Sequence, residues 1–158
     1  MTQIYQISSC SRLIIKNEVL SIFKNYIQLK NSDSEAGGVL LGRHLIDSED
    51  IVIDFITTPQ KNDCRTRTSF FRSKTHNLIA QKMWEDSNQR FAYLGLWHTH
   101  PEHIPSPSMV DMKDWKQAIK KDKYEGDKLF FLIVGQKTNR IWMITQNGDL
   151  VELFLKGN

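Results

Sequence analysis

The chain has 158 residues, of which 40% are hydrophobic and 25% charged, and its formal net charge is +3. This composition excludes a disordered chain, a collagen-like repeat and a disulfide scaffold, and so small a charge gives no reason to expect a nucleic-acid partner. The length suits one domain, so we expect residues 1–158 to form a single unit. Two cysteines without a CxxC motif, no recognisable secretory signal and no apolar run near ~20 residues predict a cytoplasmic protein without membrane contact.

The first half of the chain predicts one helix and two strands. Apolar residues recur at three- and four-residue steps from Val19 to Ile27, which indicates an amphipathic helix. Beyond Gly37-Gly38, the stretches VLLG and IVIDFI (51–56) predict two antiparallel strands. The segment from Lys61 to Lys74 is polar and basic and has no convincing periodicity, so we expect a long excursion or loop there.

The second half alternates helices with strands. SKTHNLIAQKMWEDSNQ predicts a helix, FAYLGLW a strand, and a helix should restart near Pro107. LFFLIVG predicts a buried strand, and RIWMIT and LVELFL predict a hairpin across Asn147-Gly148. The order α-β-β-α-β-α-β-β-β indicates an α/β fold, a mixed sheet flanked by helices. The buried stripes expected on the two helices are His76, Ile79, Ala80, Met83 and Trp84 on the first, and Met112, Trp115 and Ile119 on the second.

Two histidines follow the predicted strand FAYLGLW at a spacing of two. Side chains two residues apart on extended backbone point the same way, so His98 and His100 can face one point. Asp111 lies eleven residues after His100, and the intervening loop can fold the next helix back over the strand end. Two histidines and one carboxylate leave one tetrahedral position open, which is typical of a catalytic zinc site.

Hydrolysis also needs a proton acceptor that is not a metal ligand. Glu35 is the best candidate, because it opens an apolar strand beside two glycines that permit close backbone approach. Ser108 shares a helix face with Asp111, so its hydroxyl could stabilise an oxyanion. Each residue also has a structural interpretation: Glu35 fits a solvated turn, and Ser108-x-x-Asp111 fits a helix capping box. The joint pattern of E-x-G-G with H-T-H-P-x6-S-x2-D is what favours an active site.

This pattern resembles the JAMM signature of the JAB/MPN zinc metalloprotease family, H-[ST]-H-P-x6-S-x2-D, at every defined position. The resemblance implies a JAB/MPN (cytidine-deaminase-like) domain and one Zn2+ bound by His98, His100 and Asp111. It further implies that Glu35 is the general base and then the acid, and that Ser108 steadies the oxyanion. Members with all five residues hydrolyse peptide or isopeptide bonds, whereas members lacking ligands act as scaffolds.

A narrower likeness is carried by EAGGVLLGR, TTPQKNDCRTRTSFFR and the short length. These are similar to stand-alone bacterial JAB peptidases of type II CBASS antiphage operons. That likeness implies a protein substrate with an extended C-terminal tail, expected to be a conjugate of a cGAS/DncV-like nucleotidyltransferase, and an E1/E2-like ligase as functional partner. Two alternatives stay open: a peptidase that processes a bacterial ubiquitin-like protein, and a non-catalytic MPN scaffold.

The remaining titratable residues have weaker signals. His103 is expected to support the site from outside the ligand set or to be exposed, and His44 and His76 to be structural or surface residues. The segment from Lys61 to Lys74 has a formal net charge of +4, so the rest of the chain sums to −1. Its arginines, Arg65, Arg67 and Arg72, fit either contacts with acidic side chains of a protein substrate or a solvated basic loop.

Overall fold

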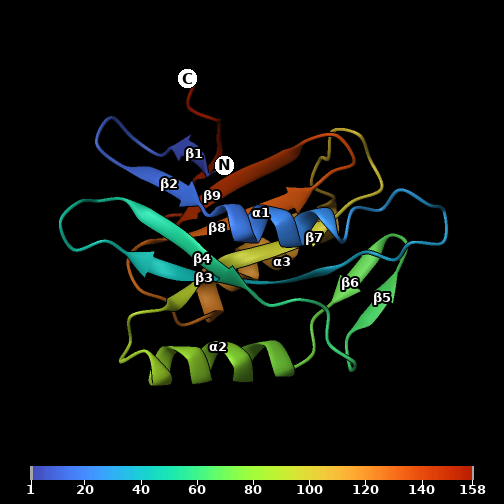
Figure 1. Ribbon diagram of the computed structural model, residues 1–158, viewed down its shortest axis with the longest axis horizontal. Coiled ribbons are helices and arrows are strands. Elements are labelled where there is room, and N and C mark those ends of the chain that lie inside the picture. Colours follow the sequence, from blue (N-terminus) through green and yellow to red (C-terminus); the bar gives the residue numbers. More distant parts are fainter. Residues whose placement is uncertain (1, 158) are drawn as a thin grey trace.

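An eight-stranded mixed sheet forms the centre of the computed structural model, which describes residues 2–157 (Figure 1). The strand order is β1-β2-β4-β3-β7-β8-β9-β10, in which β2 with β4 and β7 with β8 run parallel and the other pairs antiparallel. The expected mixed sheet is confirmed. Its strands are β1 (Gln3–Gln6), β2 (Arg12–Ile15), β3 (Gly37–His44), β4 (Ile51–Ile56), β7 (Ala92–Thr99), β8 (Lys128–Val134), β9 (Asn139–Thr145) and β10 (Leu150–Leu153).

Helices cover both faces of this sheet. Helix α1 (Asn17–Lys24) packs on one face, and α2 (Thr75–Asp86) and α3 (Met109–Lys121) pack on the other (Figure 1). Strand β8 contributes alternate side chains to the two cores, because successive residues of a strand point to opposite faces. Phe130, Leu132 and Val134 join the α1 core, whereas Leu129, Phe131 and Ile133 join the α3 core. This double burial explains the continuous apolar run in the sequence.

The outer strands of the sheet are joined near the two ends of the described chain. The amide of Gln6 donates to the carbonyl of Phe154 at 3.2 Å, and the amide of Lys156 donates to the carbonyl of Ile4 at 2.8 Å. Strand β1 is thereby covered by the segment after β10, which protects an edge that would otherwise be open to pairing. The strands β1 and β2 were not expected from the sequence.

The segment from Lys61 to Lys74 is an excursion from the main sheet, as one of the two expectations had it, and the expectation of a loop is wrong. The segment contains a two-stranded hairpin of β5 (Cys64–Thr66) and β6 (Ser69–Phe71), set apart from the main sheet (Figure 1). Both strands are only three residues long and largely exposed, so no alternation of buried and exposed residues develops along them. Contacts with distant parts of the chain, described below, hold the hairpin in place.

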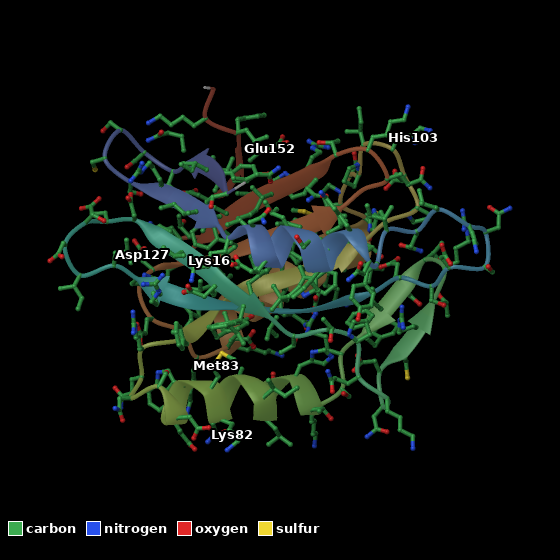
Figure 2. All side chains as sticks on the ribbon, viewed as in Figure 1. Lys16, Lys82, Met83, His103, Asp127 and Glu152 are labelled. Atoms are coloured by element: carbon green, nitrogen blue, oxygen red, sulfur yellow. The ribbon has the colours of Figure 1, made fainter. Side chains whose placement is uncertain are left out.

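The apolar stripe predicted for α2 is only partly correct. His76 is fully buried, and Met83 points from α2 toward the sheet while Lys82 points away (Figure 2). Trp84, by contrast, is 36% exposed, because α2 packs on the core of the sheet through Ala80 and Met83 instead. The stripe predicted for α3 is confirmed, since Trp115 and Ile119 are buried and Met112 packs against them.

The predicted hairpin of β9 and β10 is present, but its turn has a different backbone conformation from the type I′ turn that Asn-Gly favours. Gly148 has a φ of 87°, while Asn147 is not among the residues with positive φ, so one residue rather than two supplies the left-handed conformation. Within residues 2–157, no helix is both long and apolar enough to cross a membrane.

Candidate metal centre and active site

The two motif histidines lie at the end of β7, in the middle of the sheet. His98 is paired with Gly37 of β3 on one side and Ile133 of β8 on the other, and the amide of His100 donates to the carbonyl of Val134 at 3.0 Å. Their Nε2 atoms face each other at 3.0 Å, and both residues are buried. The expectation that extended backbone turns both imidazoles to one point is confirmed.

Asp111 reaches the same point from the first turn of α3. Its Oδ1 lies 3.2 Å from Nε2 of His98, and its Oδ2 lies 3.1 Å from Nε2 of His100. The capping box considered in the sequence is also present: Ser108 Oγ accepts from the Asp111 amide at 3.0 Å, and Asp111 Oδ2 accepts from the Ser108 amide at 2.8 Å. The helix cap therefore sets the direction of the Asp111 carboxylate.

Glu35 lies two residues before β3, the strand next to β7, and faces the histidines. It is 4% exposed, and one carboxylate oxygen lies within 4.8 Å of ring nitrogens of His98 and His100. The predicted close approach of the backbone after Glu35 to a neighbouring strand is confirmed at Gly37, where a Cβ would lie 2.7 Å from the carbonyl oxygen of Trp97 in β7. A side chain at this position would push β3 and β7 apart and move Glu35 away from the histidines.

The hairpin β5–β6 holds the backbone of Glu35 from both sides. The Glu35 amide donates to the carbonyl of Thr66 at 2.8 Å, and Arg65 Nε donates to the carbonyl of Glu35 at 2.7 Å. Arg67 donates to the carbonyl of Lys30 and Arg72 pairs with Asp114, so all three arginines of the basic segment make contacts within the protein.

The donor set fits a tetrahedral zinc ion. Ligand atoms about 2.0–2.1 Å from Zn²⁺ in a tetrahedron are about 3.3 Å apart. The two Nε2 atoms are 3.0 Å apart, and each lies 3.1–3.2 Å from a different oxygen of Asp111, which is close to that spacing. On its other ring nitrogen, Nδ1, His100 contacts Glu102 Oε1 at 2.7 Å. A proton held on Nδ1 by this carboxylate leaves Nε2 free as a ligand, an arrangement that recurs around zinc in proteins.

The two carboxylates of the cluster differ in their acidity. Burial raises the pKa of Glu35 to about 7, an effect that the charge of His100 partly offsets. Burial acts in the same direction on Asp111, but hydrogen bonds from His100, His98 and the Ser108 amide outweigh it and hold that pKa well below its usual range. For His100, burial lowers the pKa, whereas hydrogen bonds to Asp111 and Glu102 raise it, with a net value of about 9. A cluster with one permanently ionised carboxylate and one that titrates near neutrality can combine metal binding with proton transfer.

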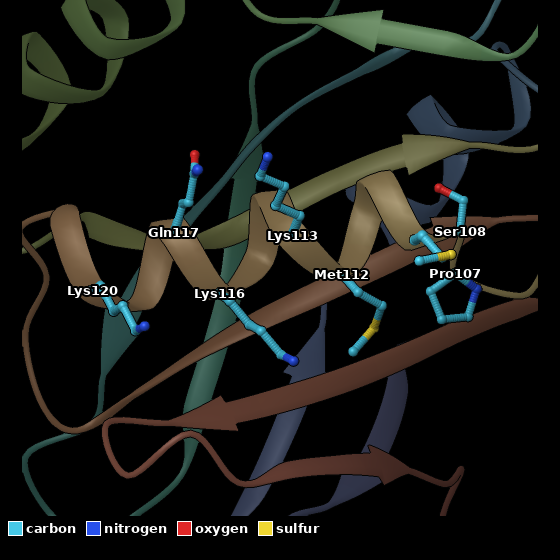
Figure 3. A pocket seen from close by; sticks show the side chains of 8 residues that line it. Pro107, Ser108, Met112, Lys113, Lys116, Gln117 and Lys120 are labelled. Carbon is cyan, nitrogen blue, oxygen red and sulfur yellow. The ribbon is translucent and has the colours of Figure 1, made fainter.

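Ser108 lies at the exposed side of the cluster. Its hydroxyl oxygen accepts from the Asp111 amide, which leaves the hydroxyl proton available to a substrate. A surface hollow of about 580 Å³ begins at Ser108 and runs along α3 past Met112, Lys116 and Lys120 (Figure 3). Of the five predicted site residues, Ser108 is the one that lines this hollow, so the hollow adjoins the cluster rather than containing it.

The other histidines lie outside the cluster. His103 is exposed on the loop between β7 and α3, at the upper right of Figure 2, as one of the two expectations had it. His76 is a buried structural residue, as expected: Nδ1 contacts Thr57 Oγ1 at 2.6 Å and Nε2 contacts Asp63 Oδ2 at 2.8 Å. This bridge ties the start of α2 to the segment after β4.

Two residues near the cluster were missed in the sequence. Glu102 had a usable signal, because a carboxylate two residues after a candidate metal ligand is placed to hydrogen-bond its second ring nitrogen. Gln28 had none: it lies beyond the end of α1, and nothing in its local sequence indicates that it is 1% exposed. It bonds Thr99, the residue between the two histidines, at 2.7 Å.

Comparison with known proteins identifies relatives that cover most of the chain. A family model described as prokaryotic homologs of the JAB domain matches residues 26–145. A protein of Escherichia coli named CD-NTase/cGAS isopeptidase is 35% identical over 134 residues, which cover 84% of this chain and 81% of that protein. A protein of the same name from Pseudomonas aeruginosa is 34% identical over 138 residues, covering 87% and 85% of the two chains.

A solved structure shares the fold at lower identity. The solution structure of a protein from Desulfitobacterium hafniense aligns with a TM-score of 0.61 and 19% identity, covering 87% of each chain. The extent of the family match and the identity to the Escherichia coli protein both support the resemblance seen in the sequence. The chain belongs to the family of prokaryotic JAB domain homologues.

Proposed function

We propose that this protein is a zinc-dependent isopeptidase of bacterial antiphage defence of the CBASS type. Its substrate is the amide bond that joins the C-terminus of a cGAS/DncV-like nucleotidyltransferase to a target amine. The relatives named CD-NTase/cGAS isopeptidase, at 34–35% identity over most of the chain, support this activity and this substrate. An E1/E2-like ligase would form the conjugates, and both proteins would act in the bacterial cytoplasm.

The observation that carries the proposal is the convergence of Asp111 with His98 and His100, beside the buried carboxylate of Glu35. Asp111, whose pKa is held low, is suited to be a permanent ligand together with His98 and His100. Glu35, whose pKa is raised to about 7, is suited to accept and return a proton at neutral pH. A scaffold without catalysis gives no reason for a buried glutamate to titrate beside a complete ligand set.

The reaction follows from these positions. Bound zinc would supply Lewis acidity that polarises the scissile carbonyl and makes water a nucleophile near pH 7. Glu35 accepts a proton as the water oxygen bonds to the carbonyl carbon, and the carbonyl oxygen becomes negatively charged. The Ser108 hydroxyl donates a hydrogen bond to that oxygen. When the carbon–nitrogen bond breaks, Glu35 returns its proton to the leaving amine, so a carboxylate and a free amine are the products.

The substrate tail has to lie extended beside Glu35. The β5–β6 hairpin contacts the Glu35 backbone directly and, within the described residues, pairs with no strand of the main sheet. Addition of the tail as a further strand to this hairpin is the mode of binding that we propose, because main-chain bonds can grip an extended peptide irrespective of most of its side chains.

The test uses a nucleotidyltransferase whose C-terminus is linked to the ε-amine of a lysine in a target peptide. We expect the zinc-loaded protein to release the free C-terminus, identified by mass spectrometry, and chelation followed by zinc addition to abolish and restore cleavage. Glu35→Gln should retain zinc at wild-type stoichiometry and not cleave. Cleavage by Glu35→Gln at an undiminished rate would show that another group is the base.

A parallel reaction separates the substrate alternatives. A bacterial ubiquitin-like protein linked through its C-terminus to the same lysine peptide should be cleaved with a lower kcat/KM. The reverse preference would make the ubiquitin-like protein the substrate. Failure to bind zinc at near-stoichiometric occupancy, together with no cleavage of either conjugate, would support the scaffold.

A further inference from the structure

Glu35 and Ala36 precede the first residue of β3, so their position depends on contacts besides the sheet ladder. The backbone of Ala36 lies against Thr99, the residue between the two histidines. The Thr99 amide donates to the Ala36 carbonyl at 2.9 Å, and the Ala36 amide donates to the Thr99 hydroxyl at 2.9 Å. A side-chain hydroxyl therefore takes the place that a backbone carbonyl has in a regular ladder.

The hydroxyl of Thr99 has one proton, and its direction is determined by its neighbours. Because Thr99 Oγ1 already accepts from the Ala36 amide, its proton goes to Gln28 Oε1, 2.7 Å away. Thr99 is fully buried and Gln28 is 1% exposed, so water does not compete for these bonds.

The amide nitrogen of Gln28 uses both of its protons. It donates to the carbonyl of Asp33 at 3.1 Å and to the carbonyl of Arg67, in the turn of the β5–β6 hairpin, at 2.9 Å. The reversed amide would direct an acceptor at two carbonyl oxygens, which determines the orientation of the side chain. One buried side chain thus joins the histidine strand, the loop before Glu35 and the hairpin that holds the Glu35 backbone.

We propose that Gln28 is a positioning residue for the isopeptidase reaction: acting through Thr99, it sets Glu35 against His98 and His100. The inference rests on the proposed function, because it assigns Glu35 a position that matters for proton transfer. The hydrogen bonds of the Gln28 side chain within residues 2–157 go to Asp33, Arg67 and Thr99 and not to the histidine rings or the Glu35 carboxylate, so its effect passes through the backbone.

The predicted metal ligands are held in place by hydrogen bonds that do not involve Gln28. His98 pairs with Ile133 in the parallel β7–β8 ladder, the His100 amide bonds Val134, and Asp111 is held by the α3 cap. Loss of the Gln28 bonds should therefore displace the base while the zinc ligands stay in place. A displacement of about 1 Å in a catalytic group is enough to lower a rate about 100-fold.

The test compares Gln28→Met, which keeps the shape of the side chain but removes its hydrogen bonds, with Thr99→Val and the double variant. We expect each single variant to lower kcat at least about 10-fold with KM and zinc affinity within about threefold of wild type. The double variant should be no slower than the worse single variant, because both changes break one chain of bonds. Thr99→Ser, which keeps the hydroxyl, should retain kcat.

Thr145→Val is the matched control. The Thr145 hydroxyl is buried at the far end of β9 and has no hydrogen-bond partner among residues 2–157, so its removal should leave kcat unchanged. Multiplicative losses in the double variant, or a kcat of Gln28→Met within twofold of wild type, would overturn the inference. If Gln28→Met does not fold, Thr99→Val against Thr99→Ser decides the same question.

Hydrogen exchange gives a readout that does not depend on cleavage. We expect the amides of Glu35 and Ala36 to exchange faster in Gln28→Met and Thr99→Val than in wild type and Thr145→Val. Unchanged exchange at both amides would refute the positioning role of Gln28. If the wild-type protein cleaved no conjugate but the variants still showed this difference in exchange, the proposed function would be wrong and the contribution of Gln28 to the position of Glu35 would remain.

Discussion

Ser108 and Asp111 each accept a hydrogen bond from the other's backbone amide, and the oxygen of Asp111 that accepts from Ser108 also lies 3.1 Å from Nε2 of His100. One carboxylate thus belongs both to the cap of α3 and to the predicted metal site. The structural and the functional interpretations of S-x-x-D are therefore compatible. They make different predictions for substitutions at Ser108.

A series at Ser108 separates its two roles. Ser108→Ala removes the cap and the hydroxyl, whereas Ser108→Asp keeps a capping oxygen and, when ionised, has no proton to donate. We expect Ser108→Ala to lower the free energy of unfolding by about 1 kcal/mol and Ser108→Asp to leave it nearly unchanged. Both should lower kcat about 100-fold, because both lose the donor to the oxyanion. Recovery of kcat in Ser108→Asp would show that Ser108 acts only through Asp111.

Glu102 and His103 are adjacent, but we expect only a substitution of Glu102 to lower the affinity for zinc. Glu102→Gln replaces the carboxylate that contacts Nδ1 of His100, so we expect zinc affinity to fall about 10–100-fold. His103→Ala removes an exposed ring outside the cluster and should leave the affinity unchanged. Competition with a chromophoric chelator measures both. A loss of affinity in His103→Ala would mean that the third histidine of H-x-H-x-x-H takes part in binding.

Local spacing explains why much of the site could be predicted. His98 and His100 converge because a strand repeats every two residues, and Asp111 joins them because a short loop returns to the strand end. Buried strands such as β8 were equally clear, since their apolar runs are continuous. These features depend on residues close in sequence or on a single packed face.

Features built from distant contacts could not be predicted in this way. Gln28 forms hydrogen bonds with Arg67 and Thr99, which are 39 and 71 residues away. The residues next to Gln28 in the sequence do not indicate either of these bonds. The β5–β6 hairpin is stabilised by bonds to Glu35 and Gln28 rather than by burial of alternate side chains. Trp84 was misplaced for a related reason, because helical periodicity does not reveal that α2 packs on the sheet through Ala80 and Met83 and leaves Trp84 exposed.

The raised pKa of Glu35 predicts how activity depends on pH. The base has to be ionised to accept a proton, so we expect kcat/KM of the zinc-loaded protein to rise as Glu35 ionises, with a midpoint between 4.5 and about 7, because burial raises the pKa and the charge of Zn²⁺ lowers it. Glu35→Gln should remove the activity at every pH. A pH profile that is flat from 5 to 8 would contradict the assignment of Glu35 as the base.

The same shift predicts a stability change in the metal-free protein. Burial makes the folded state hold the Glu35 proton more tightly than the unfolded state, whose pKa is near 4.5. Between pH 4.5 and about 7 the unfolded state therefore binds fewer protons, and the free energy of unfolding falls as pH rises. Relative to wild type, Glu35→Gln should gain about 2–3 kcal/mol between pH 5 and pH 8. Urea unfolding at both pH values measures this, and parallel changes in the two proteins would contradict it.

Arg65 tests whether the basic segment positions the base or grips the substrate. Its Nε donates to the carbonyl of Glu35, so Arg65→Met should displace the base and lower kcat about 10-fold with little change in KM. If Arg65 instead pairs with acidic side chains of the substrate, KM should rise while kcat stays constant. Arg67→Met is the control, because Arg67 contacts the carbonyl of Lys30 and not that of Glu35. Equal losses of kcat in the two variants would assign the effect to the charge of the hairpin rather than to the bond that holds Glu35.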